Sequence, residues 1–227
     1  MQEVNRIFIA AHELKAPLNL LRQLALNLDQ SDSETDFETL RSEMISVSNR
    51  AIRQVNDLTK VARLEDGLFP MEPVVVQTVC DDVVAELKHL FASENRHLSV
   101  HYSNKSKLAI ANRELLFSVV YNFLTNALHY SNRETISNLS VMNYKNHIRI
   151  KIRDFGPALP LNIWRDLKND RLKSPTPIAM RPNSSGLGLY IASKFSRYMN
   201  AKIGAIRHRD GTSFFIELPI SNQMSLF

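Results

Sequence analysis

The chain has 227 residues, of which 44% are apolar, and its 28 basic and 23 acidic side chains give a formal net charge of +5 at pH 7. This length and composition suffice to bury one substantial core with a smaller helical element, and they exclude a disordered tail or a miniprotein held by disulfides. Cys80 is the only cysteine. With no partner for a disulfide and no ligand set for a structural zinc, a reducing, cytoplasmic compartment is the simplest interpretation.

The charge is unevenly placed along the chain. Residues 1–69 carry 8 basic and 11 acidic side chains, whereas residues 70–227 carry 20 and 12. The basic second part suits a polyanionic ligand such as nucleic acid or a nucleotide phosphate, but a lysine surplus also simply keeps a domain soluble. No run of about 18 or more apolar residues occurs, and the first residues lack a basic region followed by a long apolar core, so we expect neither a membrane span nor a signal peptide.

The first 62 residues predict a pair of long helices. Apolar residues recur in alternating steps of four and three, at Ile7, Ala11, Leu14, Leu18, Leu21, Ala25 and Leu28. The polar cluster DQSDSETD breaks this heptad pattern, and Ser33 with Asp36 resembles a capping box that restarts a helix. A second stripe follows at Leu40, Met44, Val47, Ala51, Val55, Leu58 and Ala62. Because a two-helix hairpin has too little core to stand alone, we expect a second copy to complete a dimeric four-helix bundle.

The segment EDGLFP, residues 65–70, combines a turn signal with a proline and predicts a domain boundary. Beyond it, alternating apolar and polar runs predict seven strands, and longer periodic runs predict helices near residues 77–94, 112–130, 160–168 and 187–199. The predicted fold class is α+β: an N-terminal helical hairpin over residues 1–66, then an α/β sandwich over 70–221 with a mixed sheet and helices on one face. Residues 169–185 contain three prolines and no apolar period, which favours a mobile lid.

His12 is the first candidate functional residue. It follows the heptad position Ala11 and therefore points away from the seam into solvent. An exposed neutral imidazole can act as a nucleophile, and the adjacent Glu13 is placed to orient the ring or to take its proton. A zinc-protease helix would need a second histidine where Ala16 stands, which excludes that kind of metal site. On these residues alone, a surface histidine without a function remains an open alternative.

Three further motifs carry weak signals individually. Asn122 and Asn126 lie four apart on one helix face and are followed by His129 and Tyr130, a polar ledge suited to hydrated Mg²⁺ and phosphate oxygens. Asparagine pairs of this kind are also common by chance.

The other two motifs are built on glycine. Asp154 and Gly156 end a strand, where a carboxylate can accept a hydrogen bond from an exocyclic amine such as that of adenine, although a plain strand-ending turn would look the same. Gly186 and Gly188 stand at a helix start, where backbone N–H groups and the helix dipole favour phosphate, and a flexible loop is the alternative.

Taken in order, HELKAPL, NFLTNALHY, DFGPA and SSGLGLYI resemble the H, N, G1 and G2 boxes of bacterial two-component sensor histidine kinases. The likeness spans the chain, from a dimerisation and phosphotransfer hairpin to an ATP-binding domain of the gyrase, Hsp90, histidine kinase and MutL superfamily. The resemblance implies that His12 attacks the γ-phosphate of ATP and becomes phosphohistidine, and that Glu13 orients or deprotonates it.

The resemblance also implies roles for the second part of the chain. Asn126 would coordinate Mg²⁺ with Asn122 on the same ledge, and Asp154 with Gly156 would recognise adenine. The remaining nucleotide-site residues would be His129, where the family commonly has a lysine that meets phosphate, Tyr130 as a pocket wall, and Gly186, Leu187 and Gly188 as lid hinge and phosphate-binding amides. The implied partners are a second copy of the chain and a response-regulator receiver domain, with no nucleic acid.

Departures from the family pattern set further expectations. Ala158 and Ser184 stand where glycines are usual, which reduces backbone freedom. Ala16 replaces the threonine or asparagine found four residues after the histidine in members that also dephosphorylate their partner, so we expect weak or absent phosphatase activity. Only 11 residues precede His12, so we expect a fragment of a longer sensor, with any membrane anchor in a missing upstream region.

Two alternatives remain open. A degenerate kinase would bind ATP poorly and serve as a dimeric scaffold or phosphorelay intermediate, which Ala158, Ser184 and His129 favour. A mechanical ATPase of the gyrase or Hsp90 type would share the ATP-binding fold, but the hairpin with His12 and the lack of a transducer domain argue against it.

Overall fold

The structure is a computed structural model, and contacts divide the chain into two compact units, Met1–Glu65 and Asp66–Phe227. It describes residues 15, 17–28, 34–103, 107–132, 135–169, 171–172 and 186–221. Several sequence predictions therefore lie outside the described residues: those for His12, Glu13, Ala16, Ser33, Ser184 and most of the lid segment 169–185.

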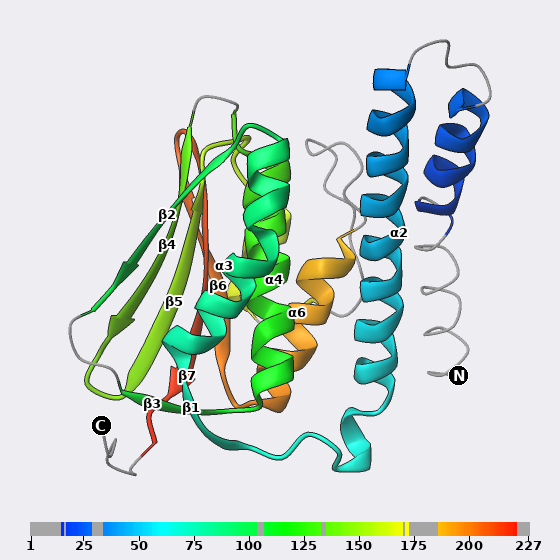
Figure 1. Ribbon diagram of the computed structural model, residues 1–227. Coiled ribbons are helices and arrows are strands. Elements are labelled where there is room, and N and C mark those ends of the chain that lie inside the picture. Colours follow the sequence, from blue (N-terminus) through cyan, green and yellow to red (C-terminus); the bar gives the residue numbers. More distant parts are fainter. Residues whose placement is uncertain are drawn as a thin grey trace. The chain divides into compact units, whose positions relative to one another are not determined.

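The first unit is built from two helices that lie side by side (Figure 1). Residues 17–28 are helical, and the long helix α2 (Glu34–Ala62) is followed by the 3₁₀ turn η1 (Leu64–Asp66). Leu24 and Ala51 are buried. Ala51 belongs to the second predicted stripe, but Leu24 lies one residue before the predicted Ala25, which is exposed, and Leu18 of the first stripe is 58% exposed. Val55 was expected on the inner stripe but is 41% exposed, because the buried side of α2 continues from Ala51 to Val61 in steps that turn Val55 outward.

The second unit contains a five-stranded mixed sheet in the order β2-β4-β5-β7-β6, in which β2 and β4 are parallel and the other pairs are antiparallel. A separate antiparallel pair joins β1 to β3. The elements run as β1 (Glu72–Val75), α3 (Val76–Ser93), β2 (His97–Tyr102), β3 (Leu108–Ala111), α4 (Arg113–Tyr130), β4 (Ile136–Asn143), β5 (His147–Asp154), α5 (Leu161–Lys168), α6 (Leu187–Tyr198), β6 (Lys202–His208) and β7 (Gly211–Pro219).

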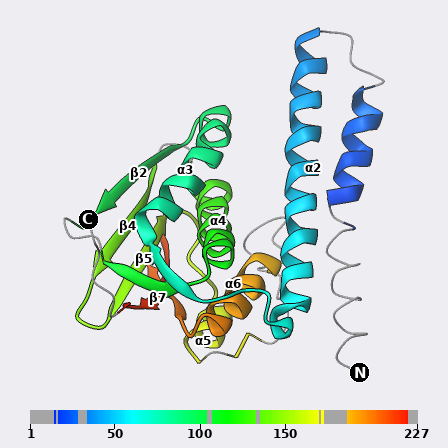
Figure 2. The same cartoon turned by 60° about the horizontal axis from the view of Figure 1, so that its bottom comes forward.

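The core lies between the sheet and helices α3, α4 and α6, which cover one face of it (Figures 1 and 2). The sequence HIRIKIRD of β5 alternates strictly, so Ile148, Ile150 and Ile152 are at most 1% exposed. The rings of Phe123 on α4 and Phe214 on β7 stack with centroids 5.5 Å apart. The predicted α+β fold, with a mixed sheet and helices on one face, is confirmed.

Helix α4 contributes much of the core, and its last residues lie next to the turn that follows β5. Asn112 caps its start, because the Asn112 Oδ1 accepts the Leu115 N–H at 3.1 Å. The helix buries every apolar position that the sequence predicted to face inward, namely Leu116, Val119, Val120, Phe123, Leu124 and Ala127. Its polar positions are therefore held in a fixed direction by the packing of the opposite side.

Two further properties follow from packing. Burial in α3, and secondarily the neighbouring Asp81 carboxylate, raise the pKa of the Cys80 thiol well above its usual value, so this thiol stays protonated. Within the described ranges, each helix is too short or too polar to span a bilayer.

Candidate active site

Asp154 ends β5 with its side chain on the helix-covered face of the sheet. It is only 1% exposed, and its Oδ1 accepts the backbone N–H of Thr212 at 3.0 Å. A carboxylate in this position requires hydrogen-bond donors, since an unpaired buried charge is strongly destabilising. The strand register directly pairs Asp154 with Thr212, so β7 supplies one donor through its backbone.

Gly156 lets the turn after β5 pack on the end of α4. A Cβ at this residue would stand 1.8 Å from the Tyr130 carbonyl oxygen and 2.7 Å from the Tyr130 carbonyl carbon. Both are backbone atoms, so no side-chain rotation relieves the overlap. The structure therefore brings the predicted Tyr130 and Gly156 into contact, and only glycine permits the contact.

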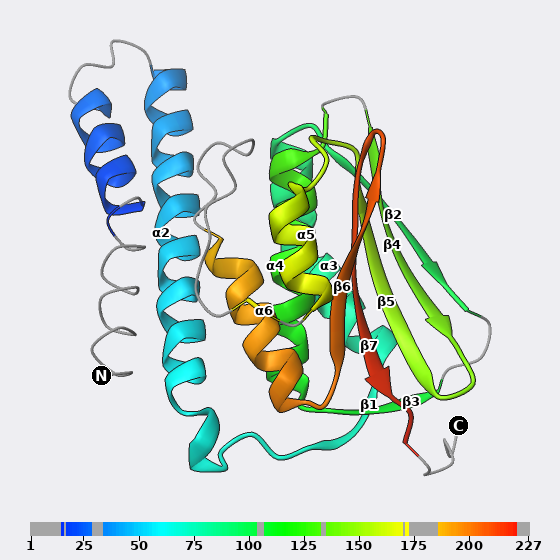
Figure 3. The ribbon, with the colours of Figure 1, turned by 180° about the vertical axis from the view of Figure 1, so that it is seen from behind.

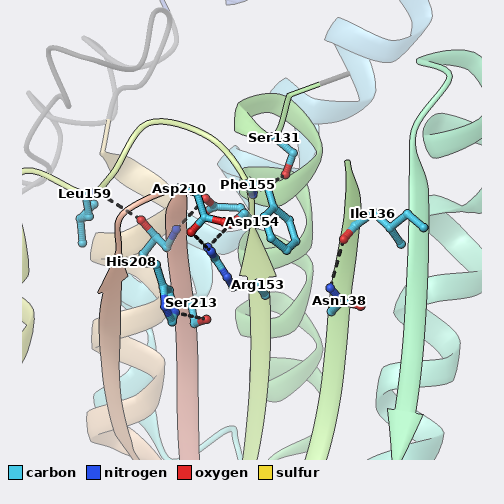
Figure 4. Close-up of polar contacts among 11 residues, drawn as sticks. Ser131, Ile136, Asn138, Arg153, Asp154, Phe155, Leu159, His208, Asp210 and Ser213 are labelled. Atoms are coloured by element: carbon cyan, nitrogen blue, oxygen red, sulfur yellow. Dashed lines mark hydrogen bonds and ion pairs between the residues drawn. The ribbon is translucent and has the colours of Figure 1, made fainter. Parts of the chain in front are cut away.

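Ser131 stabilises the same junction between the turn after β5 and the end of α4. Its role was not predicted from the sequence. Its hydroxyl oxygen accepts the Phe155 N–H at 3.1 Å (Figure 4). It also lies 3.1 Å from the hydroxyl oxygen of the buried Ser137. The Asn132 N–H donates to the Phe155 carbonyl at 2.9 Å. Phe155 is thus held through both of its backbone groups, which fixes Asp154 and Gly156 on either side of it.

Thr212 and Gly211 also belong to this site without having been predicted. The Thr212 hydroxyl oxygen accepts the Leu159 N–H at 3.1 Å, so one residue ties both Asp154 and the loop after it to β7. Gly211 has φ +141°, and a Cβ there would lie 2.2 Å from the Asp154 carbonyl oxygen. In the sequence, only the segment HRDGTS pointed to these residues. It predicts a turn, but it does not predict that the turn lies next to Asp154.

The two predicted asparagines differ in their surroundings. The Asn122 side-chain amide donates to the Ser118 carbonyl at 2.9 Å, and its Oδ1 lies 2.9 Å from where a Cβ at Gly188 would stand. Asn122 is therefore packed between α4 and the start of α6. Asn126, one turn further along, is half-buried and makes no side-chain hydrogen bond in the described part of the chain, which leaves its amide oxygen able to accept a ligand.

Helix α6 begins at the predicted glycine motif. Gly186 caps it in the left-handed conformation, with φ 74° and ψ −3°, and no side chain caps the first turn. Leu187 is fully buried, so its contribution to a ligand site would be its position in the first helical turn and not its side chain. A helix start of this kind presents backbone N–H groups and positive potential to an anion.

The remaining predicted residues lie at the rim of the site. His129 is exposed in the last turn of α4, and Tyr130 is half-buried beside it. Ala158, expected to restrict a glycine position, is not among the described residues with positive φ, which are Asn95 and Asn200 besides glycines. Alanine at this position is therefore unstrained.

Arg153 lies next to Asp154 in the sequence. Its guanidinium binds the Asp210 carboxylate at 2.6 Å and lies 4.3 Å from the centre of the Phe155 ring (Figure 4).

The family profile for histidine kinase-, DNA gyrase B- and HSP90-like ATPases matches residues 111–222, the stretch that holds all of these groups. Over 92% of its length the chain is 27% identical to the histidine protein kinase SaeS of Staphylococcus aureus strain USA300. This chain belongs to the histidine kinase family. The resemblance drawn from the four motifs is thereby confirmed.

Other members of the family give the same result. The probable sensor histidine kinase TcrY of Mycobacterium tuberculosis is 26% identical over 96% of this chain. This histidine kinase chain spans 61% of the length of SaeS and 46% of that of TcrY. The relatives named here are kinases, which disfavours the gyrase-type mechanical ATPase.

Solved structures share the fold. The histidine kinase AdeS of Acinetobacter baumannii superposes with a TM-score of 0.64 at 18% identity, covering 93% of this chain and 98% of that one. The histidine kinase ThkA, solved in complex with response regulator protein TrrA, superposes with a TM-score of 0.65 at 16% identity, covering 97% of this chain and 61% of that one. At these identities the likeness establishes the fold.

Proposed function

We propose that this histidine kinase autophosphorylates on His12 with ATP and Mg²⁺ and transfers the phosphoryl group to an aspartate of a response-regulator receiver domain. The observation that carries the proposal is the convergence of three family motifs on α4: Tyr130 contacts Gly156, and Asn122 contacts Gly188. Family membership and the ThkA complex with its response regulator support the same conclusion.

The side chains at this junction fit a nucleotide. Asp154, buried at the strand end, offers an acceptor for the exocyclic amine of adenine, and the start of α6 offers backbone donors to phosphate. The half-buried Asn126 amide provides an oxygen ligand of the kind that Mg²⁺ accepts. Bound Mg²⁺ would supply charge neutralisation at the phosphates. The related kinase ShkA, solved in complex with AMPPNP, supports a nucleotide in this fold.

The proposed transfer has two steps. A neutral His12 ring nitrogen attacks the γ-phosphorus, the bond from that phosphorus to the bridging oxygen breaks, and ADP leaves with the electron pair. Glu13 orients the ring or takes its proton. The phosphoryl group then moves from the imidazole to an aspartate carboxylate of the receiver domain, which regenerates the neutral histidine.

The hairpin surface supports a homodimer. Apolar side chains that one copy leaves 43–58% exposed recur along both helices, at Leu18, Leu26, Phe37, Ile45 and Ile52. The steps of seven and eight residues between them place these side chains on one side of each helix. A second copy would bury these stripes and complete a four-helix bundle.

Incubation with γ-labelled ATP and Mg²⁺ tests the proposal. We expect a phosphoprotein whose label is labile to acid and stable to base, because phosphorus is bound to imidazole nitrogen. His12→Ala should remove the label while leaving nucleotide binding intact. Nucleotide binding without any label would instead support the scaffold or phosphorelay alternative, which His129 and Ser184 favour at the positions of a family lysine and glycine.

A second expectation concerns the reverse reaction. Alanine at position 16 has no hydrogen-bonding group to position a water near a receiver phosphoaspartate, so we expect little phosphatase activity. A phosphorylated receiver incubated with this protein and ADP should keep its label as long as it does alone. Ala16→Thr should accelerate the loss. Rapid dephosphorylation by the unmodified chain, undiminished by His12→Ala, would contradict this assignment.

A further inference from the structure

The five-stranded sheet leaves one face uncovered by the described helices. Figures 1 and 3 show α3, α4 and α6 on the same side of the sheet, and the Trp164 indole N–H of α5 donates to the Ala205 carbonyl of β6. We call the opposite side, on which Arg149, Lys151 and Arg153 of β5 lie, the open face. A solvated face is common for sheets rich in antiparallel strands, so exposure alone carries no function.

The charge on the open face departs from an ordinary solvated surface. Its strand positions include Arg149, Lys151, Arg153 and Lys202 and four of the seven histidines, but a single acid, Glu217. Glu217 already pairs with the Arg149 guanidinium. Lys151 and Lys202 form no ion pair within the described ranges. Arg153 pairs with Asp210 in the turn between β6 and β7, so the uncompensated positive charge of the face is that of Lys151 and Lys202.

The histidines add to this surface. His97 and His101 are exposed on the edge strand β2. His147 lies 3.4 Å from Glu217, and His208 contacts the Ser213 hydroxyl at 2.9 Å. Partial burial first, and then the neighbouring Arg153 guanidinium, lower the pKa of His208, so this imidazole stays neutral near pH 7.

Aliphatic side chains stand among these cations. Ile136 is 52% exposed, Met142 46% and Ile206 39%. The strand register places Ile136 beside His97, Met142 beside Arg149 and Ile206 beside Ser213. Each apolar side chain is thus flanked by a polar one, whereas protein interfaces concentrate their energy in a contiguous apolar centre.

The aromatic rings of the open face are already engaged. The Tyr144 ring stacks on the His147 ring at 4.6 Å, and the Arg149 guanidinium lies 5.0 Å from it. Arg149 also lies 4.8 Å from the centre of the Phe215 ring, and this ring packs closely against Gly204. Each of these rings already has an intramolecular stacking or cation contact that a stacking base would have to displace, which disfavours single-stranded nucleic acid.

We propose that the open face docks on an anionic lipid surface. A broad sheet face that mixes unpaired lysines with separated aliphatic side chains suits a bilayer interface, where the lysines are attracted to anionic headgroups and the aliphatic groups enter the headgroup boundary. The proposal is independent of the phosphotransfer chemistry and assigns this domain a second, peripheral contact.

Vesicle co-sedimentation of the full 227-residue chain tests the proposal. With vesicles of equal parts phosphatidylglycerol and phosphatidylcholine, we expect binding that Lys151→Glu with Lys202→Glu weakens at least about tenfold. The matched control, Lys88→Glu with Lys107→Glu, makes the same charge change at exposed lysines off the open face and should weaken binding by less than about twofold. Unchanged thermal unfolding midpoints would verify that both variants fold.

Further arms separate lipid docking from general charge attraction. Ile136→Ser with Ile206→Ser should also weaken vesicle binding, and the loss should persist at high salt, where charge attraction is screened. Equal losses in the two lysine variants, no binding by the unmodified chain, or no effect of the serine variant would overturn the proposal. So would a polyglutamate peptide or duplex DNA that binds through the open face more tightly than the vesicles.

Discussion

Gly156→Ala is expected to abolish nucleotide binding, with the affinity for ATP falling by more than about 100-fold. The new Cβ would stand 1.8 Å from the Tyr130 carbonyl oxygen and 2.7 Å from its carbonyl carbon. Both are backbone atoms, so a side-chain rotation cannot relieve the clash. The turn carrying Asp154 and Phe155 would have to leave the end of α4, breaking the hydrogen bonds that Phe155 makes to Ser131 and Asn132. Calorimetric titration with ATP measures the loss directly.

A matched substitution separates this local effect from general destabilisation. Gly67 has φ +70° and no atom within 4 Å of the place where a Cβ would stand, so Gly67→Ala adds backbone strain of about 1 kcal/mol without a clash. Its nucleotide affinity should equal that of the unmodified chain. Wild-type affinity in Gly156→Ala would show that the turn after β5 does not hold the nucleotide.

Asn126→Asp is expected to abolish autophosphorylation, with a rate loss of about 100-fold or more. A carboxylate would place a negative charge where the half-buried amide faces the proposed metal and triphosphate. Because the Asn126 side chain makes no hydrogen bond in the described part of the chain, the fold should not depend on it. The thermal unfolding midpoint and the dimer should therefore be retained while labelling from γ-labelled ATP is lost.

Asn122→Asp provides the contrast one helical turn away. Its side-chain amide donates to the Ser118 carbonyl, which a carboxylate cannot do, and its Oδ1 packs at Gly188. We expect this variant to lower the unfolding midpoint, as the loss of a partly buried hydrogen bond costs about 1–3 kcal/mol. Normal labelling in Asn126→Asp, or a midpoint that falls as far as in Asn122→Asp, would remove the metal role from Asn126.

The sequence predicted the elements of the second unit because their patterns are local and strong. The strict alternation of HIRIKIRD indicates a strand with one buried face, and α4 buries each apolar position that its spacing marked. Asp154 and Gly156 were found because they end such a strand. Because the predicted strand ends at Asp154, the sequence also predicted that both residues lie at the carboxyl end of this strand.

The parts that the sequence did not predict depend on contacts between distant segments. Thr212 reaches Asp154 through the pairing of β5 with β7, which no local pattern specifies. Asn122 packs at Gly188 of α6, and the spacing of Asn122 and Asn126 on α4 gives no indication of that neighbour. Val55 was wrongly predicted to be buried. Its spacing from Ala51 fits the stripe, but the side of α2 that is buried depends on the packing of the two helices, which the spacing does not specify.

Mapping the phosphorylated residue by mass spectrometry under neutral conditions, after incubation with ATP and Mg²⁺, tests the central claim most directly. The chain has seven histidines, and four of them lie on the open face of the sheet. The proposed function predicts a single phosphorylated residue, His12. Phosphate on any other residue, or none on a chain that binds the nucleotide, would contradict it.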